Sequence, residues 1–247
     1  FREQACIDEA SAAVLAWVWS RLAKEPTADE LSSTENVLCF DMGGGTTDVS
    51  AVTVRELAEY VDGSKDQIAL EVCSSDGSSF GGDDLDRAIS KKVLVELNKR
   101  AGETGGKVPV AEILEAIDRP SLAEFASWLT AEDSKLDAEH LWQFSEDLIF
   151  KCERAKCELS GDNDERQVSF TTAQVPLVRK TRSEADYTQI VIRRQEIGLL
   201  LREETNKLVR LLRLVVANAG WGRDDVHVLL LTGQAIRFTP VQHAIIA

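Results

Sequence analysis

The sequence predicts an α/β protein whose core is interrupted by a helix-rich α+β subdomain. Short apolar runs typical of buried strands lie near both ends, at residues 37–40 and 226–231. A helix-rich section from residue 108 to 159 separates them. We therefore expect three regions: 1–80 as the first part of the core, 81–180 as the inserted subdomain and 181–247 as the second part of the core.

The first region reads as one helix followed by three strands. A segment rich in helix formers begins at Ser11, a possible N-cap, and predicts a helix to about Leu22. The run Val37–Phe40, the alternating residues 47–54 and the run 67–74 predict strands. The core therefore begins with a sheet.

The elements that follow are mostly helical. The pattern predicts a helix over residues 83–99, further helices between 108 and 159 with the longest at 141–159, strands at 167–172 and 188–192, one long helix at 194–219 that ends at Gly220, and a buried strand at 226–231.

Composition limits the partners and the cellular setting. The 247 residues have 44% hydrophobic content and a formal net charge of −14, so a nucleic acid or an anionic membrane surface would repel the chain. No apolar stretch is long enough to span a membrane, and no signal peptide opens the chain, which predicts a cytoplasmic protein. An odd number of scattered cysteines predicts reduced, mostly buried thiols: Cys6, Cys39, Cys73, Cys152 and Cys157.

A glycine loop lies between the first two predicted strands, at residues 41–48. A P-loop or a dinucleotide fingerprint would instead connect a strand to a helix. Without Cβ atoms, Gly43, Gly44 and Gly45 let backbone N–H groups converge on phosphate oxygens, and Asp41 at the strand end can hold Mg²⁺ through its water shell. The alternative is an ordinary glycine-rich hairpin.

The order of motifs resembles the second lobe of the ATP-binding domain of DnaK-type heat-shock chaperones, which belong to the actin and sugar-kinase superfamily. The segments that carry this resemblance are 7–13 (IDEASAA), 38–50 (LCFDMGGGTTDVS), 81–86 (GGDDLD), 152–156 (CERAK) and 231–237 (LTGQAIR). The Cys-Glu-Arg-Ala-Lys segment discriminates best, because actins and sugar kinases lack it. The resemblance implies an actin-like, ribonuclease-H-like ATPase lobe.

The resemblance also implies roles for individual residues around the phosphates. Glu9 matches the carboxylate that orients the attacking water, although an acid in a first helical turn is also favoured by the helix dipole alone. Asp41 and Asp48 match acidic positions around the metal. The positions expected to contact or surround the phosphates are Gly43, Gly44, Gly45, Thr46, Gly81 and Gly82.

A second set of residues matches the contacts to adenosine. Glu153, Lys156 and Ser160 share one helical face, which could equally be a solvated polar stripe with an i,i+3 ion pair. Gly233 and Arg237 match the later adenosine motif. The sequence departs from the family at Cys157, where an arginine normally stacks on the base, and at Gln234, where the family has a second glycine. At these two positions the sequence lacks the residues with which the family holds the adenine base.

The resemblance implies binding of ATP or ADP with Mg²⁺, and closure of two lobes that regulates a separate peptide-binding domain. It also implies that the family's first phosphate loop and first lobe precede Phe1, that the peptide-binding domain follows Ala247, and that this piece alone is a poor ATPase. A co-chaperone or exchange factor is a possible partner. The alternatives are a non-hydrolysing nucleotide sensor or scaffold, and a relative of sugar kinases or filament-forming actins.

Residues 108–141 resemble a helical insertion that typical family members lack. This insertion and the start of the following helix are rich in large apolar side chains: Phe125, Trp128, Leu129, Leu141, Trp142 and Phe144. Two interpretations stay open. These side chains either pack internally, onto Ile149 and the helix at 83–99, or form a docking surface for a partner.

Overall fold

The computed structural model describes residues 7–22, 34–56, 68–132, 136–161, 163–178, 187 and 189–247, so Cys6 lies outside the described residues. The chain divides into two compact units. Unit 1 comprises Phe1–Gly82, Glu203–Arg237 and Ala244–Ala247, and unit 2 comprises Asp83–Arg202 and Phe238–His243.

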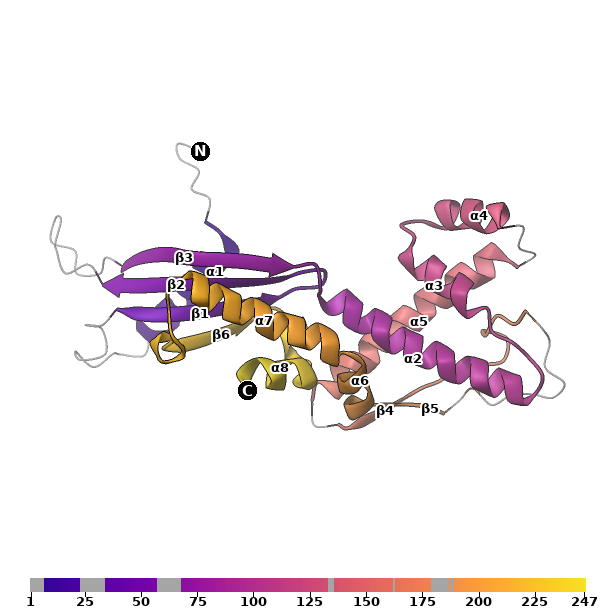
Figure 1. Cartoon of the computed structure of the whole chain (residues 1–247). Coiled ribbons are helices and arrows are strands. Elements are labelled where there is room, and N and C mark those ends of the chain that lie inside the picture. Colours follow the sequence, from indigo (N-terminus) through magenta and orange to yellow (C-terminus); the bar gives the residue numbers. More distant parts are fainter. Residues whose placement is uncertain are drawn as a thin grey trace. The chain divides into compact units, whose positions relative to one another are not determined.

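Unit 1 is built on a four-stranded sheet with the order β3-β2-β1-β6 (Figure 1). The strands β1 (Glu35–Met42), β2 (Thr47–Glu56) and β3 (Ile68–Ser78) form an antiparallel meander. Strand β6 (Val228–Thr232) comes from the far end of the chain and pairs in parallel with β1. The segments predicted to form the core from the two ends of the sequence thus share one sheet.

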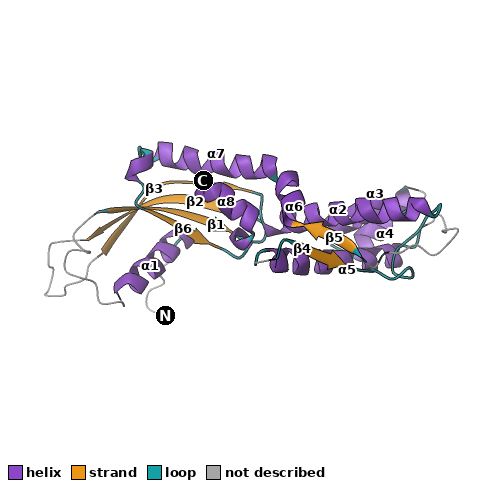
Figure 2. Ribbon diagram, turned by 90° about the horizontal axis from the view of Figure 1, so that it is seen from below, coloured by secondary structure: helices purple, strands orange, loops and turns teal. Residues whose placement is uncertain are grey.

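Helix α1 (Glu9–Leu22) covers one face of this sheet. Its buried residues Val14 and Val18 pack against alternate residues of β1 and β2, including Val37 and Cys39. Figure 2 shows α7 along the opposite face of the sheet. Because side chains alternate along a strand, Asp41 lies on the same face as Val37 and Cys39, the face that α1 covers.

The start of α1 differs from the prediction. The helix begins at Glu9, and the carboxylate of Asp8 accepts a hydrogen bond from the Ser11 backbone N–H at 2.8 Å. Asp8 is therefore the N-cap, three residues before the serine that the pattern suggested. The Ser11 hydroxyl donates a second bond to Asp8 at 2.7 Å.

A single helix predicted over residues 194–219 is wrong. The structure has α6 (Arg194–Leu200) and α7 (Arg202–Asn218), separated at Leu201, where φ is −89° and ψ is 0°. No proline lies at this point, and the buried Leu201 still donates its N–H to the Ile197 carbonyl. The break is therefore not caused by a proline. Gly220, with φ of 75°, follows the end of α7 as predicted.

A β-bulge interrupts the pairing of β2 with β3. Ala51 pairs with Ser74, but the next residue, Val52, pairs with Val72, so Cys73 is the extra residue. The Cys73 sulfur lies 3.3 Å from the Thr53 hydroxyl oxygen. Strand β3 also extends four residues beyond its predicted end at 74. This extension places further side chains at the end of the sheet where the glycine loop joins β1 to β2.

Unit 2 contains the predicted helix-rich section and a small sheet. Its elements are α2 (Gly82–Glu103), α3 (Val110–Asp118), α4 (Leu122–Ala131), α5 (Ala138–Leu159), β4 (Glu165–Val168) and β5 (Ile190–Arg193), with β4 and β5 antiparallel. Strand β4 begins earlier and is shorter than the predicted strand at 167–172.

The chain closes with two short 3-10 helices, Arg223–Asp225 and Ala235–Arg237, and α8 (Thr239–Ile246).

The aromatic side chains of the insertion pack on one another. Phe125 is fully buried, with its ring centroid 5.9 Å from that of Trp128 and 6.2 Å from that of Trp142. Phe144 packs against Phe170 at 5.2 Å. Both tryptophans are half-buried. These contacts favour internal packing over the alternative docking surface.

The four described cysteines are all free thiols. Cys39 and Cys152 are buried, Cys73 is half-buried and Cys157 is exposed on α5. None of the described helices is long and apolar enough to cross a lipid bilayer.

Candidate functional site

The glycine loop forms a tight hairpin between β1 and β2. Gly43 donates its N–H to the Thr46 carbonyl at 2.9 Å, which leaves Gly44 and Gly45 at the exposed tip. An added Cβ at Gly45 would meet no atom within 4 Å. The tip is thus open to a ligand, and its backbone N–H groups are suited to bind an anion.

Two other glycines support this hairpin from the segment after β3. Gly82 donates its N–H to the Gly43 carbonyl at 3.0 Å. A Cβ at Gly81 would lie 2.5 Å from the Gly44 carbonyl oxygen, so the two backbones approach too closely for any other residue. Both glycines are buried and therefore shape the loop from the protein side.

Thr47, the first residue of β2, is fully buried, and its hydroxyl donates to the Phe80 carbonyl at 2.7 Å. This bond ties the start of β2 to the segment that leads into Gly81. A hydrogen bond therefore holds the two parts together at this position.

Gly233 supports the hairpin from the end of β6. Its φ is 83°, and a Cβ there would lie 2.2 Å from the Met42 carbonyl oxygen and 2.6 Å from an Asp41 carboxylate oxygen. Only glycine fits both the backbone conformation and the available space. The loop is therefore held by segments that are distant in the sequence but adjacent in unit 1.

Three predicted site residues meet at one pocket of unit 1. Asp41 and Asp48 are direct cross-strand partners, so their side chains leave the sheet on the same face. Glu9, in the first turn of α1, lines the same pocket of about 560 Å³. The complete lining is Asp8, Glu9, Ala10, Cys39, Asp41, Asp48, Ser50, Val72, Ser75, Asp76 and Gly77.

This pocket is strongly acidic. Five of its lining residues carry carboxylates, and none is a lysine or an arginine. The two hydrogen bonds from Ser11 lower the pKa of the Asp8 carboxyl, so Asp8 stays ionised. Burial, and then the negative charge of Asp41, raises the pKa of the Cys39 thiol to about 12. The Cys39 thiol thus stays protonated, so Cys39 lines the pocket but does not act as a nucleophile.

The donor set fits a magnesium ion that keeps water ligands. Carboxylate oxygens are the ligands that Mg²⁺ takes in proteins, usually one or two beside several waters. Among the described residues, no group of three or more His, Cys, Asp or Glu side chains is placed to hold a metal ion directly. Asp41 and Asp48 therefore suit an ion that is completed by water and by ligand oxygens.

Eight of the eleven lining residues of the pocket were not predicted to belong to a site, and three of these, Asp8, Asp76 and Gly77, bear on its charge and shape. Asp8 was not assigned a role, although its position before the helix is a recognisable N-cap signal. Asp76 and Gly77 lie beyond the predicted end of β3. A Cβ at Gly77 would lie 2.8 Å from an Asp48 carboxylate oxygen, so this glycine leaves room for that side chain.

The predicted adenosine contacts lie in different units. Glu153 and Lys156 are on α5 of unit 2, and Ser160 is the C-cap of that helix. Gly233 and Arg237 belong to unit 1, with Arg237 exposed. A single adenosine site formed by both sets stays a prediction.

Lys156 has a well-defined partner inside unit 2. Its Nζ lies 2.6 Å from a carboxylate oxygen of Asp86 on α2, and the two side chains are 12% and 9% exposed. Asp86 therefore makes a contact between two helices that are distant in the sequence. Its other carboxylate oxygen is buried and has no hydrogen-bond partner in the described structure.

Burial raises the pKa of Asp86 to about 6 from 3.8, and the hydrogen bond and charge of Lys156 oppose part of that rise. The folded state thus holds this proton more tightly than the unfolded state. The contribution of Asp86 to the free energy of unfolding is greatest below its unfolded pKa and is lost as the pH rises through 6.

We expect Asp86→Asn to remove this pH dependence. The free energy of unfolding of the variant, relative to the unmodified protein, should rise between pH 4 and pH 7 by at most about 3 kcal/mol. Urea unfolding curves at several pH values measure this difference. Glu146→Gln, at an exposed position of α5, is the control and should show no such change. A parallel pH profile for Asp86→Asn and the unmodified protein would contradict the prediction.

The fold and the pocket define an ATPase lobe of the actin-like class. The antiparallel strands β1 to β3 and the parallel strand β6 form one sheet. The glycine hairpin between β1 and β2 lies beside the paired carboxylates of Asp41 and Asp48. The family model described as Hsp70 protein matches residues 3–112. Residues 3–112 are therefore similar to part of a nucleotide-binding domain of the Hsp70/DnaK type. The match includes Glu9, the glycine hairpin and the Gly81–Gly82 pair, whereas the predicted adenosine contacts lie outside it.

Proposed function

We propose that this chain is the ATP-binding lobe of an Hsp70-like molecular chaperone ATPase. In the natural protein, nucleotide-driven closure against a first lobe would control a peptide-binding domain, and a co-chaperone or exchange factor would be a partner. A cytoplasmic location is part of the proposal. The observation that supports it best is the convergence of Glu9, Asp41 and Asp48 on one pocket beside an open glycine hairpin.

We assign a distinct task to each kind of group in and beside the pocket. The N–H groups at the tip, from Gly44 and Gly45, would donate hydrogen bonds to phosphate oxygens, and the Thr46 hydroxyl lies at the same edge. The carboxylates of Asp41 and Asp48 would hold Mg²⁺ through water. When bound, this ion supplies the positive charge that lets a polyphosphate approach an acidic pocket.

Glu9 is suited to position a water molecule for hydrolysis. Its carboxylate projects from the first turn of α1, while the neighbouring Asp8 is occupied by the helix cap. The Glu9 carboxylate would accept a hydrogen bond from the attacking water and so hold it for attack on the terminal phosphate. Hydrolysis is therefore assigned to Glu9 and binding to the hairpin and the paired aspartates.

A second candidate function is a nucleotide sensor that binds without hydrolysis. Cys157, at the position where the resembling family has its base-stacking arginine, is exposed on α5. A thiol provides no planar cation for a cation–π contact with adenine. Single-turnover hydrolysis by the natural protein separates the two functions, because a sensor would release ATP unchanged.

We expect ATP binding to depend on Mg²⁺ and on Asp41. Titration calorimetry with the chain should show binding of Mg-ATP and no binding when EDTA is present. Asp41→Asn should weaken Mg-ATP binding roughly tenfold or more, since a hydrogen bond to a charged group contributes about 1.5–3 kcal/mol.

Asp76→Asn is the matched control for this titration. It removes a carboxylate from the same pocket but not from the directly paired positions, so it should have a smaller effect than Asp41→Asn. Equal affinity for ATP with and without Mg²⁺ would contradict the proposed role of the aspartate pair.

A further inference from the structure

A second cavity lies within unit 2, between α2 and β5. It has a volume of about 270 Å³ and shares no lining residue with the pocket of unit 1. One wall is a stripe at every fourth position of α2, formed by Lys92, Glu96 and Arg100. The other wall is the extended run 189–193, which comprises Gln189 and β5, together with Glu196 of α6. The cavity therefore runs between a helix and a strand.

Strand β5 has backbone groups that its pairing with β4 leaves unused. Arg194, directly after β5, donates its N–H to the Asp164 carbonyl at 2.9 Å. Hydrogen-bonded and non-hydrogen-bonded pairs alternate along an antiparallel pair of strands, so Ile192 bonds to β4 and Val191 does not. The N–H and C=O of Val191 point away from β4, and neither has a partner among the described residues.

The unused edge of β5 faces α2. The carbonyl of Gln189, two positions before Val191, accepts a hydrogen bond from the Arg100 guanidinium at 2.8 Å. Backbone groups two positions apart in a strand point to the same edge, so those of Val191 also open toward the cavity that this residue lines. An unpaired strand edge of this kind is a template for a further strand.

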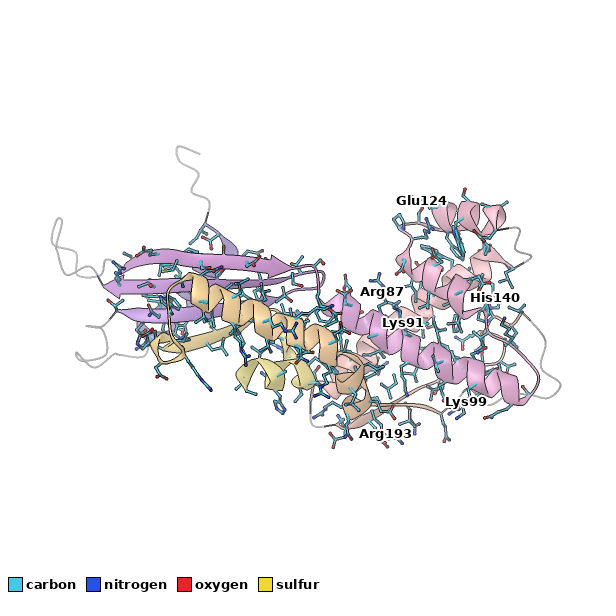
Figure 3. All side chains as sticks on the ribbon, in the orientation of Figure 1. Arg87, Lys91, Lys99, Glu124, His140 and Arg193 are labelled. Atoms are coloured by element: carbon cyan, nitrogen blue, oxygen red, sulfur yellow. The ribbon has the colours of Figure 1, made fainter. Side chains whose placement is uncertain are left out.

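The cavity is positively charged, although the protein is acidic. Its lining has three cations, Lys92, Arg100 and Arg193, against two carboxylates, whereas the whole chain has a formal net charge of −14. Figure 3 labels two exposed lysines of α2, Lys91 and Lys99, that lie one position from lining residues. The charge of this region therefore favours an acidic ligand.

The ion pairs of Arg193 can be exchanged for contacts to a ligand. Arg193 lies 3.5 Å from a carboxylate oxygen of Glu165 and 3.6 Å from one of Glu196, and 54% of its side chain is exposed. Exposed pairs at such distances contribute little to stability. On α2, Val95 lies four positions from each of the two exposed lysines and is itself 64% exposed. A ligand that combines carboxylates with apolar side chains fits this mixture of groups.

We propose that the cavity between α2 and β5 binds an acidic, extended segment of a partner protein, which adds to β5 as a third strand. Backbone hydrogen bonds to Val191 would hold the segment, and its carboxylates would meet Lys92, Lys99 and Arg193. This binding site is independent of the nucleotide pocket and goes beyond the proposed function. The competing interpretation is that the charges beside β5 only prevent this edge from pairing with other chains.

The first test titrates the full chain into a labelled, capped peptide in which glutamate and valine alternate, with fluorescence anisotropy as the readout. The peptide should bind, and a matched peptide with lysine in place of glutamate should bind at least about tenfold more weakly, because like charges would then meet in the cavity. Equal affinity for the two peptides would contradict the proposed ligand chemistry.

Backbone methylation of the peptide tests strand addition without changing the protein. Alternate amides of a strand point to opposite edges, so one peptide is N-methylated at its glutamates and the other at its valines. Only one of the two should lose binding, because only one edge pairs with β5. If both peptides bind like the unmethylated one, or both fail to bind, addition to the edge is excluded.

Variants of Val191 test the same contact from the side of the protein. Val191→Pro removes the N–H that opens toward the cavity, and proline is tolerated at a strand edge whose N–H is unpaired. Its affinity for the peptide should fall by about threefold to tenfold, the range of a single hydrogen bond. Val191→Thr keeps both the N–H and the branched side chain, and should bind like the unmodified protein.

Amide hydrogen exchange of the unmodified protein keeps the proposal testable even if Val191→Pro is poorly folded. The Val191 amide should exchange quickly in the free chain and become protected when the peptide binds, whereas the Ile192 amide should change little. Peptide binding without protection of Val191 would indicate a charge contact only and overturn the proposal. Protection that grows with protein concentration in the absence of peptide would identify a second copy of the chain as the occupant, and would overturn it as well.

Discussion

Replacement of Glu9 by Gln in the natural protein should slow hydrolysis of bound ATP by about 10²-fold, the lower end of the range for a positioned general base. The neutral amide has nearly the same shape but accepts a proton far less readily. The affinity for Mg-ATP should stay nearly unchanged, because Glu9 is expected to act on water and not on the nucleotide. Single-turnover hydrolysis and equilibrium titration together measure the two quantities.

The contrast with Asp41 makes this prediction specific. Glu9 and Asp41 line the same pocket, but Asp41→Asn should mainly weaken binding, whereas Glu9→Gln should mainly slow the chemical step. Asp8→Asn serves as a further comparison, since Asp8 caps the helix that carries Glu9. A collapse of affinity in Glu9→Gln, with turnover of bound ATP preserved, would make Glu9 a binding residue.

Replacement of Gly233 by Ala should have the largest effect on stability. The new Cβ would lie 2.2 Å from the Met42 carbonyl oxygen at a φ of 83°, so the backbone of β1 or of the turn must move. Left-handed backbone costs a non-glycine residue about 1–2 kcal/mol, and overpacking adds typically 1–3 kcal/mol. We expect a loss of roughly 2–5 kcal/mol in the free energy of unfolding, together with loss of Mg-ATP binding.

Gly45→Ala provides the matched control for stability. Gly45 lies at the tip of the hairpin, and an added Cβ would meet no atom within 4 Å. The unfolding curve of Gly45→Ala should therefore stay close to that of the unmodified protein. Similar losses of stability in both variants would show that the close approach of Gly233 to β1 does not constrain the hairpin.

The sequence was sufficient for features that depend on local chemistry. Three consecutive glycines after an apolar run indicate a hairpin whose backbone can approach a ligand, and Gly220 marks a helix end because a left-handed residue can stop a helix there. The positions of Glu9, Asp41 and Asp48 followed from the order of motifs. The Hsp70 match to residues 3–112 supports the resemblance on which that order rests, and the α/β fold confirms the fold class.

Features that depend on distant parts of the chain appeared only in the tertiary structure. The parallel pairing of β6 with β1 brings Gly233 against Asp41, and the bulge at Cys73 sets which residues of β3 reach the pocket. No proline marks the break at Leu201. Burial of Asp86 against Lys156 likewise needs α2 and α5 to pack. Strand partners, register and burial are set by contacts across many residues, whereas turns and caps are set by neighbours in the chain.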